Sequence, residues 1–537
     1  MIRRLLPILL LLAGNCAAPA AASKPLGEAA AGLAAQLPKG GIVTGESAGG
    51  PAAYALAGNV GVAGVPPERI LFEIGSISKV FTGLLLAQAV VEGRVKLDAP
   101  IRDLLEPKQT FADARVGAIT LRQLAAHTSG LPRLPEELDQ GANPGDPYAH
   151  YDRARLEAGL ARLQLAGDAP FPRSYSNYGA GLLGDLLSRL YGKPWETLVR
   201  EKIAGPLGLP DTVVRLDADQ QRRFAPPFSG NSPAHPWNLA SLEGAGALRS
   251  TAADLMAFGA ALLHPGQTPL REALELLLAP QSADGAIGLG ISLSRLFGER
   301  GYEHSGGTGG FASGLYVLPE SGSVKVILIN NAVLSDGAVL AATHSSAPPR
   351  ESARAFAADE LAEFTGVYPL DSMSRFTLLL RGGQLWVRLS GQPFFPLHPH
   401  ATPDRFFLKV VPAEIQFERK EGAIQSLTLF QNGRETQAAK SPEPAPVIDF
   451  RSDRELASLA GAYAVNPEMN FTVKVRHSTL FVKLNQQPAL PVFETSKDWF
   501  EYDVVSAALE FERDKENRVV ALWLFQNGAA FRAAKKD

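Results

Sequence analysis

The 537-residue sequence predicts an α+β domain followed by two small all-β, barrel-like domains. Two observations carry this prediction. Up to about residue 345, helical patterns mix with the patterns of antiparallel strands, which is typical of an α+β domain. The last third then contains an internal repeat with an offset of 95 residues, as between Gly366 and Gly461. The length agrees, because one ordinary core is too small for such a chain and a prior of roughly three domains follows.

The N-terminus has the pattern of a secretory signal peptide, predicted as residues 1–22. Two arginines are followed by an apolar run over residues 5–12 and then by small residues. That run is shorter than the about 20 apolar residues that a membrane-spanning helix needs. Cleavage after Ala20 or Ala22 fits the pattern, since both end an Ala-x-Ala triplet. We therefore expect a periplasmic or secreted protein.

Cys16 is the only cysteine, and it lies inside the predicted signal. Its context from Leu12 resembles a lipoprotein lipobox, from which Asn15 departs. Two interpretations stay open: Cys16 is lipidated and anchors the chain to a membrane, or it is removed with the signal. In both, the mature chain can form no internal disulfide.

Composition excludes one large class of partner. Charged residues make up 20% of the chain and the formal net charge is −3, with no long basic run, so a nucleic acid is not an expected partner. The histidines show no metal-ligand spacing, and no phosphate loop or dinucleotide fingerprint is found, so no metal or organic cofactor is predicted.

The first domain is predicted over residues 23–345 and mixes helices with an antiparallel sheet. Apolar spacing and end signals predict helices over 76–92, 178–191 and 251–263. Residues 312–318 and 324–330 are predicted to be paired strands around a Pro-Glu-Ser-Gly turn.

The two β domains are predicted over residues 353–440 and 450–537. LWVRLSGQPFFPL (385–397) matches LFVKLNQQPALPV (480–492), and LTLFQNG (427–433) matches LWLFQNG (522–528). In the first copy, Gly382-Gly383 is a hairpin turn between two short strands. Pro- and Ser-rich linkers precede each copy, over 345–352 and 441–446. Neither copy carries a catalytic pattern.

Ser47 lies in Gly-Glu-Ser-Ala-Gly, which fits the G-x-S-x-G elbow of α/β-hydrolases. In that fold several strand–helix units precede the elbow, whereas only about 25 residues would precede Ser47 once the signal is removed. Pro51 also opposes a helix directly after the serine. We therefore predict two strands, over 42–47 and 52–57, and no nucleophile at Ser47.

Ser76 and Lys79 form the only Ser-x-x-Lys match in the chain, at the start of the predicted helix 76–92. Positions i and i+3 share one helix face, so the Lys79 amine can reach the Ser76 hydroxyl. The positive helix N-terminus favours an alkoxide and disfavours a charged lysine, which suits a serine nucleophile with a lysine base.

Two further stretches follow Ser76-x-x-Lys79 in a fixed order. Tyr175-Ser176-Asn177 comes just before a predicted helix, and His304-Ser305-Gly306 just before a strand pair. As a set they resemble the serine β-lactamase and DD-peptidase superfamily, with the class C-like branch, peptidase family S12, as the best match. The resemblance extends to ITLRQLAAHTSGLP (119–132), KIAGPLGLPDT (202–212) and GALRSTAADLMAFG (246–259), and spans nearly all of residues 40–335.

The resemblance implies a role for each motif residue. It makes Ser76 the nucleophile, Lys79 its base, alone or shared with Tyr175, and Tyr175 the proton donor to the leaving group. Asn177 would bind Lys79 and the substrate amide, and His304 and Gly306 would line the substrate pocket. The backbone N–H groups of Ser76 and Gly307 would form the oxyanion hole. His127 is expected to be structural, capping a turn beneath the site.

The substrate class stays open among several alternatives. The β-lactamases of the superfamily usually carry Lys-Thr-Gly where this chain has His304-Ser305-Gly306, and a histidine is mostly neutral at pH 7, so an efficient β-lactamase is disfavoured. The D-aminopeptidases of family S12 resemble this plan of a catalytic domain with two β-barrels. The first hypothesis is therefore a hydrolase of amides or peptides that contain a D-amino acid (D-aminopeptidase or DD-carboxypeptidase type).

The alternatives are a carboxylesterase with the same mechanism and a catalytically silent binding or scaffold protein. The expected partner of the enzyme is a small peptide, amide or ester, and the mechanism requires no cofactor. The sequence leaves the oligomeric state open.

Overall fold

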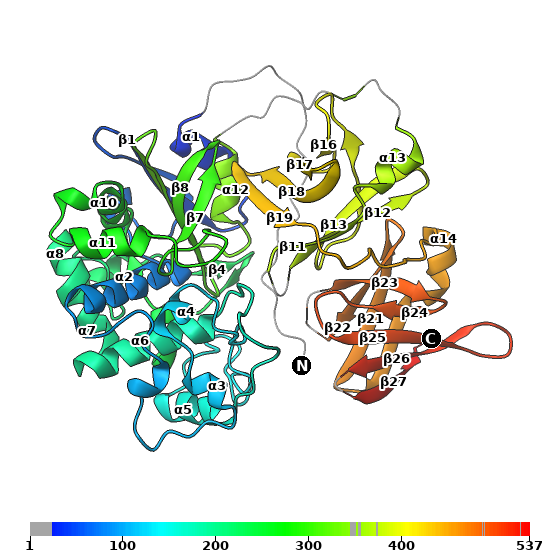
Figure 1. The fold of residues 1–537 in the computed structure, drawn as a ribbon, viewed down its shortest axis with the longest axis horizontal. Coiled ribbons are helices and arrows are strands. Elements are labelled where there is room, and N and C mark those ends of the chain that lie inside the picture. The colour runs from blue at the N-terminus through cyan, green and yellow to red at the C-terminus, as the bar shows by residue number, and fades with distance from the viewer. Residues whose placement is uncertain are drawn as a thin grey trace. The chain divides into compact units, whose positions relative to one another are not determined.

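The computed structural model describes residues 24–343, 351–352, 356–371, 374–485, 487, 489–526 and 528–536 (Figure 1). The predicted signal peptide with Cys16, most of the first linker and the repeat positions Pro488 and Asn527 lie outside this part. The described chain forms two compact units. The N-terminal unit holds the residues up to 343 together with Phe430–Thr436, and the C-terminal unit holds 351–429 and 437–536. No helix among the described residues is long and apolar enough to cross a membrane.

An antiparallel sheet forms the centre of the N-terminal unit, with strand order β7-β8-β9-β10-β1-β2. These strands are β1 (Gly40–Ala48), β2 (Ala53–Asn59), β7 (Ser292–Leu296), β8 (Glu299–Gly307), β9 (Ala312–Leu318) and β10 (Ser323–Ile329). Beyond β7, the first residues of β19 (Arg434–Ala439) extend the sheet, with Arg434 opposite Leu296. Shorter strand pairs are β3 (Phe72–Glu73) with β6 (Arg249–Ser250), and β4 (Phe228–Ser229) with β5 (Ser232–Pro233).

Helices cover both faces of this sheet (Figure 1). The described α-helices of this unit, on the sheet and beyond it, are α1 (Leu26–Ala34), α2 (Ser78–Val91), α3 (Ala114–Gly117), α4 (Leu121–Ala125), α5 (Arg153–Arg162), α6 (Asn177–Tyr191), α7 (Trp195–Val199), α8 (Gly205–Leu207), α9 (Ala218–Arg223), α10 (Ala252–Leu263), α11 (Arg271–Leu278) and α12 (Asp336–Ala341). α1 and α12 pack on one face, against Tyr316 and Ile327. α10 packs on the other face and contacts α2 through Phe81 and Phe258, whose ring centroids lie 4.3 Å apart.

The strand prediction around Ser47 is confirmed. Ser47 lies in β1, opposite Val324 of β10, and β1 turns directly into β2. Ser47 is the next-to-last residue of β1, and the chain goes on from there into another strand and not into a helix, so it does not sit on a strand-to-helix elbow. Ser47 is therefore a sheet residue, and the nucleophile has to be found elsewhere.

The C-terminal unit contains two all-β copies whose strands follow one another in a similar order along the chain. Their strands are β11 (Gly366–Pro369), β12 (Arg375–Arg381), β13 (Gln384–Leu389), β14 (Phe395–Pro396), β15 (His398–Pro399), β16 (Arg405–Leu408), β17 (Ala413–Lys420) and β18 (Ala423–Gln431), then β20 (Gly461–Asn466), β21 (Met469–Arg476), β22 (Thr479–Leu484), β23 (Leu490–Ser496), β24 (Trp499–Glu501), β25 (Ala507–Arg513), β26 (Val519–Gln526) and β27 (Ala529–Lys535). A short helix precedes each copy, α13 (Ala358–Ala362) and α14 (Asp453–Leu456). The second copy closes into an eight-stranded barrel, whereas the strands β11–β14 of the first form a separate four-stranded sheet.

Equivalent tyrosines make equivalent bonds in the two copies. The Tyr368 hydroxyl donates to the carbonyl of Phe364 at 2.9 Å, and the Tyr463 hydroxyl donates to the carbonyl of Leu459 at 2.7 Å. All four residues are buried, so each bond satisfies a hydroxyl inside a small apolar core. The predicted two copies of one folding unit are present, while the predicted domain limits stay predictions.

Candidate active site

Ser76 lies at the entry of α2, in the turn Gly75–Ile77 that follows β3. Two hydrogen bonds fix this turn to the segment before β6. The Ile74 N–H donates to the Leu248 carbonyl at 3.0 Å, and the Leu248 N–H donates to Ser78 Oγ at 3.0 Å. The pairing of β3 with β6 continues this attachment. The hydroxyl of Ser76 is thus presented from the most firmly held end of a buried helix.

Lys79 lies one turn into α2 and reaches back to Ser76. Its Nζ is 3.0 Å from Ser76 Oγ and 2.5 Å from the carbonyl oxygen of Ala245. The side chain is 2% exposed, and burial, with a further contribution from the positive charge of Arg133, holds the pKa of Lys79 well below its usual range. A lysine with a lowered pKa is neutral more often near pH 7 and can accept a proton.

Tyr175 lies between Lys79 and two buried histidines. Its ring centroid is 4.8 Å from Lys79 Nζ, 4.6 Å from the His127 ring centroid and 6.3 Å from that of His304. Burial raises the pKa of Tyr175 to about 12, although a hydrogen bond with Ser76 and the charge of Arg133 act in the opposite direction. The phenol therefore keeps its proton at pH 7.

His127 has the structural role that the sequence predicts. Its backbone is left-handed, with φ of 59°, and its carbonyl accepts a hydrogen bond from the Ser174 N–H at 2.7 Å. Its Nδ1 lies 3.3 Å from the Ser176 N–H. Burial is the main cause of a pKa of His127 well below the usual range, so the ring accepts this bond as a neutral imidazole.

Asn177 is the first residue of α6 and lies near the site, but it bonds differently than expected. Its Nδ2 donates to the Tyr148 hydroxyl at 3.4 Å, and its Oδ1 is buried without a hydrogen-bond partner in the described part of the chain. The expected bond to Lys79 is not formed there, because the Ala245 carbonyl is the second acceptor of the lysine. A buried acceptor without a donor is costly, so Oδ1 is an unsatisfied group beside the site.

His304, Gly306 and Gly307 form the end of β8, which lies against the turn that carries Ser76. A Cβ added to Gly306 would lie 2.0 Å from the Ile74 carbonyl oxygen, and one added to Gly75 would lie 2.7 Å from the Gly307 nitrogen. Only glycine permits this approach of two backbones. The N–H of Gly307 is thereby brought next to the Ser76 turn.

The His304 side chain carries no charge at neutral pH, unlike a lysine at this position. Burial, and secondarily the charge of Lys79, lower the pKa of His304 to about 3, and its Nδ1 lies 2.7 Å from the carbonyl oxygen of Ser305. The imidazole is therefore neutral at pH 7 and provides a polar but uncharged wall.

Arg133 is a site residue that the sequence reasoning missed. It directly follows the motif over 119–132, and its guanidinium carbon lies 5.0 Å from the Tyr175 ring centroid. Its backbone carbonyl accepts the N–H of Asn177 at 2.9 Å at the start of α6. Among the described residues its side chain forms no ion pair, so its charge acts on Lys79 and Tyr175 without a carboxylate to offset it.

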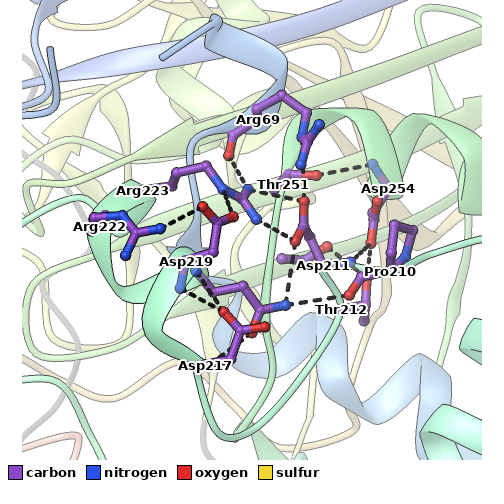
Figure 2. A network of polar contacts seen from close by, with 12 residues as sticks. Arg69, Pro210, Asp211, Thr212, Asp217, Asp219, Arg222, Arg223, Thr251 and Asp254 are labelled. Carbon is purple, nitrogen blue, oxygen red and sulfur yellow. Dashed lines mark hydrogen bonds and ion pairs between the residues drawn. The ribbon is translucent and has the colours of Figure 1, made fainter. Parts of the chain in front are cut away.

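A polar network anchors the segment that leads into β6 (Figure 2). The Arg223 guanidinium donates two hydrogen bonds to the buried carboxylate of Asp211, of 2.9 and 2.7 Å. The neighbouring Thr212 donates to Asp254 at 2.9 Å, and its hydroxyl lies 2.9 Å from that of Ser250 in β6. Because β6 pairs with β3, this network supports the strand that ends just before Ser76.

A cavity of about 510 Å³ lies beside the site and has none of the predicted site residues in its walls. Its walls include Trp237, Phe224 and Arg249. The Trp237 N–H and the Arg249 guanidinium both donate to the same oxygen of Glu73, the last residue of β3, at 2.9 and 3.0 Å. The cavity is therefore separated from Ser76 by the β3 segment, and the predicted residues assemble around Ser76 instead.

Comparison with known proteins agrees with this arrangement. The family described as "Beta-lactamase" matches residues 28–347. The chain is similar to "Penicillin-binding protein 4" of Amycolatopsis lactamdurans, with 30% identity over 287 residues that cover 49% of this chain and 73% of that protein. It is also similar to "D-alanyl-D-alanine-carboxypeptidase/endopeptidase AmpH" of Escherichia coli (strain K12), with 28% identity over 50% of this chain and 73% of that protein.

A solved structure, "Crystal Structure of Beta-Lactamase/D-Alanine Carboxypeptidase from Pseudomonas syringae", has a similar fold. Its TM-score is 0.50 at 22% identity, over 57% of this chain and 93% of that one. The resemblance that the three motifs predict is confirmed by these matches, as is the α+β fold with all-β domains behind it.

Proposed function

We propose that this chain, which belongs to the beta-lactamase family, cleaves amide bonds of peptides that contain a D-amino acid. The proposal proceeds from its being a serine hydrolase of the superfamily of that family. The observation that carries the proposal is the 3.0 Å contact between Lys79 Nζ and Ser76 Oγ, made by a buried lysine with a lowered pKa. A nucleophile in hydrogen-bond reach of a base is the requirement of covalent catalysis.

Acylation would proceed from this pair. Ser76 Oγ attacks the carbonyl carbon of the substrate, and its proton passes to the neutral Lys79 Nζ. The negative charge moves to the carbonyl oxygen, where the N–H groups of Ser76 and Gly307 would stabilise it. When the C–N bond breaks, the Tyr175 hydroxyl gives its proton to the leaving nitrogen and regains one from Lys79, leaving an ester on Ser76.

Deacylation would reverse these proton transfers with water in place of the amine. The same Lys79–Tyr175 pair takes a proton from water, which attacks the ester carbon, and Ser76 Oγ leaves with that proton. Asn177 suits substrate binding, because its unpaired Oδ1 can accept an amide N–H of the substrate. His304 and Gly306 would line the pocket as neutral groups.

Two observations support the peptide class. The two relatives described above are a penicillin-binding protein and a D-alanyl-D-alanine carboxypeptidase/endopeptidase. The neutral His304 removes the positive charge that suits the carboxylate of a β-lactam, which disfavours an efficient β-lactamase. The predicted signal over residues 1–22 supports export. A carboxylesterase with the same residues is the rival, because the same acyl-transfer mechanism cleaves an ester.

One ratio tests the proposal. We would measure kcat/KM of the mature protein for D-alanine p-nitroanilide and for p-nitrophenyl butyrate, with Ser76→Ala as the blank and L-alanine p-nitroanilide as the matched substrate. A Ser76-dependent amide rate with preference for the D form is expected. Ester turnover alone would identify a carboxylesterase, and equal rates for wild type and Ser76→Ala would refute the nucleophile.

A further inference from the structure

A short segment far along the chain lies in the N-terminal unit, next to β7, which in turn pairs with the strand that ends at Gly307. Phe430–Thr436 falls within the first predicted β repeat, yet it groups with the N-terminal unit. The segment is a tight turn in which Asn432 and Gly433 both have positive φ, of 54° and 75°. The Phe297 N–H donates to the Gly433 carbonyl at 2.6 Å, and Arg434 lies opposite Leu296 in the sheet.

Arg434 reaches from this turn to three side chains of β8 and β9. Its Nε and Nη2 donate to one oxygen of Glu303 at 2.9 and 2.7 Å. Nη2 also lies 3.2 Å from Ser305 Oγ and 3.2 Å from the Tyr316 hydroxyl. Glu303 is 7% exposed, so without Arg434 its charge would be buried with no cation beside it.

A second carboxylate completes the cluster from α12. Asp336 accepts from Ser305 Oγ at 2.6 Å and from the Tyr316 hydroxyl. It approaches the sheet at Gly314, where a Cβ would lie 2.5 Å from Asp336 Oδ2. Gly314 pairs with Ser305 in the sheet. The Ser305 hydroxyl contacts both Asp336 of α12 and Arg434, so two different elements hold the same position of β8.

The cluster lies on the face of β8 opposite to His304. Successive side chains of a strand point to opposite faces, so Glu303 and Ser305 share one face and His304 the other, toward Tyr175. Arg434 thus touches no residue proposed to contact substrate. It touches the side chains directly before and after His304, in the strand that continues to Gly306 and Gly307.

We propose that Arg434 is a positioning residue, which fixes the end of β8 so that His304 and the Gly307 N–H face the Ser76 nucleophile. This inference rests on the proposed function for its effect on rate, but its effect on β8 can be measured without any substrate. It gives the first β repeat a role that its sequence does not reveal, since the repeat supplies an arginine to the unit that holds Ser76.

The second repeat provides an internal comparison. At the position equivalent to Arg434 it has Ala529, in LFQNGAAFRAAK against LFQNGRETQAAK. Both turns follow the same Phe-Gln-Asn-Gly, so the turn itself does not require arginine. Ala529 opens β27 of the closed barrel. The arginine is therefore specific to the copy whose turn lies beside β7, from where its side chain reaches β8.

The test compares Arg434→Ala and Arg434→Lys with Arg532→Ala in the full chain. Arg532 is a matched control, because it is an arginine on the strand after the equivalent turn, paired with Glu512 at 2.8 and 2.9 Å. Hydrogen–deuterium exchange is followed in peptides that cover β8. We expect amides of residues 303–307 to exchange about tenfold faster in Arg434→Ala, because a local opening becomes easier. Arg434→Lys, which keeps the charge, should restore most of the protection.

Activity gives the second readout. We expect kcat of Arg434→Ala to fall about 10- to 100-fold with little change in KM, because misplacement of about 1 Å at catalytic groups has effects of this size. Arg532→Ala should match wild type in both readouts.

Three outcomes would overturn the inference. One is exchange in β8 equal to wild type for Arg434→Ala. Another is an equal acceleration over all peptides of the N-terminal unit, which would make Arg434 a general stability residue. The third is Arg434→Ala with faster exchange in β8 and an unchanged kcat. Absence of Ser76-dependent hydrolysis in the wild type would instead refute the proposed function, and the exchange comparison would still decide whether Arg434 holds β8.

Discussion

Replacing Arg133 by glutamine should raise the pKa of Lys79 and shift the acid limb of the pH–rate profile to higher pH. Lys79 Nζ is 4.8 Å and the Arg133 guanidinium carbon 5.0 Å from the same ring centroid of Tyr175. The two charges are therefore at most about 10 Å apart, and their repulsion at an effective dielectric constant of about 20 is about 1.7 kcal/mol. An interaction of this size moves a pH–rate limb by about one unit.

The direction follows from the protonation state that catalysis needs. Arg133 disfavours the charged lysine, so without Arg133 Lys79 holds its proton to higher pH, and less of the enzyme carries a free base at neutral pH. His304, with a pKa lowered to about 3, stays neutral over the same range and does not interfere. The backbone carbonyl of Arg133, which accepts the Asn177 N–H, is unaffected by the substitution.

The assay is log(kcat/KM) against pH for wild type, Arg133→Gln and Arg133→Lys, at low and at high salt. Arg133→Lys keeps the charge, so its acid limb should coincide with that of wild type. The shift for Arg133→Gln should shrink in high salt, because salt screens the wild-type repulsion. An acid limb that stays in place in Arg133→Gln, or moves to lower pH, would refute this electrostatic reasoning.

Three further changes test the support of the site. Burial raises the pKa of Asp254 to about 6, so between pH 4 and 6 the folded protein holds a proton that the unfolded chain releases. Wild type should therefore lose about 2 kcal/mol of unfolding free energy as pH rises from 4 to 6, and Asp254→Asn should lack this loss in urea unfolding at the two pH values. Gly306→Ala would place its Cβ 2.0 Å from the Ile74 carbonyl oxygen and displace the end of β8, so kcat should fall about 100-fold. An unchanged kcat would contradict this, because it would mean that β8 can move away without loss of rate. Arg223→Ala leaves Asp211 buried without its bidentate partner and should lower the unfolding free energy by about 3 kcal/mol; a melting temperature equal to wild type would contradict this.

Local patterns predicted the parts of the site that lie close together in sequence. The spacing of Ser76 and Lys79 implies a shared helix face, and the structure places their side chains 3.0 Å apart. The predicted helix over 251–263 matches α10, although Thr251 is its N-cap, with its side chain accepting the Asp254 N–H, and not its first helical residue. The joining of Tyr175 and His304 to this pair came from the resemblance, because no local rule relates Ser76 to residues 99 and 228 positions further along the chain.

Other contributions to the site leave no signal in a single sequence. The Ala245 carbonyl that accepts from Lys79 is a backbone atom, and any residue at that position could supply it. Asn177 was expected to bond Lys79, and that acceptor role is taken by Ala245 instead. Arg434 lies in a segment that the repeat pattern assigns to another folding unit, and its side chain has no motif of its own.

Different charges lie on the two faces of the strand β8, and this arrangement suits the proposed role of Lys79 as a neutral base. On one face lie Lys79 and the neutral His304, and Arg133 beyond Tyr175 is the charge that adds to burial. A carboxylate on that face would restore the lysine proton, because an opposite charge within about 6 Å favours the charged form. The nearby carboxylates, Glu303 and Asp336, project from the opposite face, where Arg434 offsets part of their charge. The alternation of side chains along β8 therefore places His304 on the face of Tyr175 and Glu303 on the other face, away from Lys79. In our proposal Arg434, bonded to Glu303 and Ser305, holds β8 in the position in which both conditions are met.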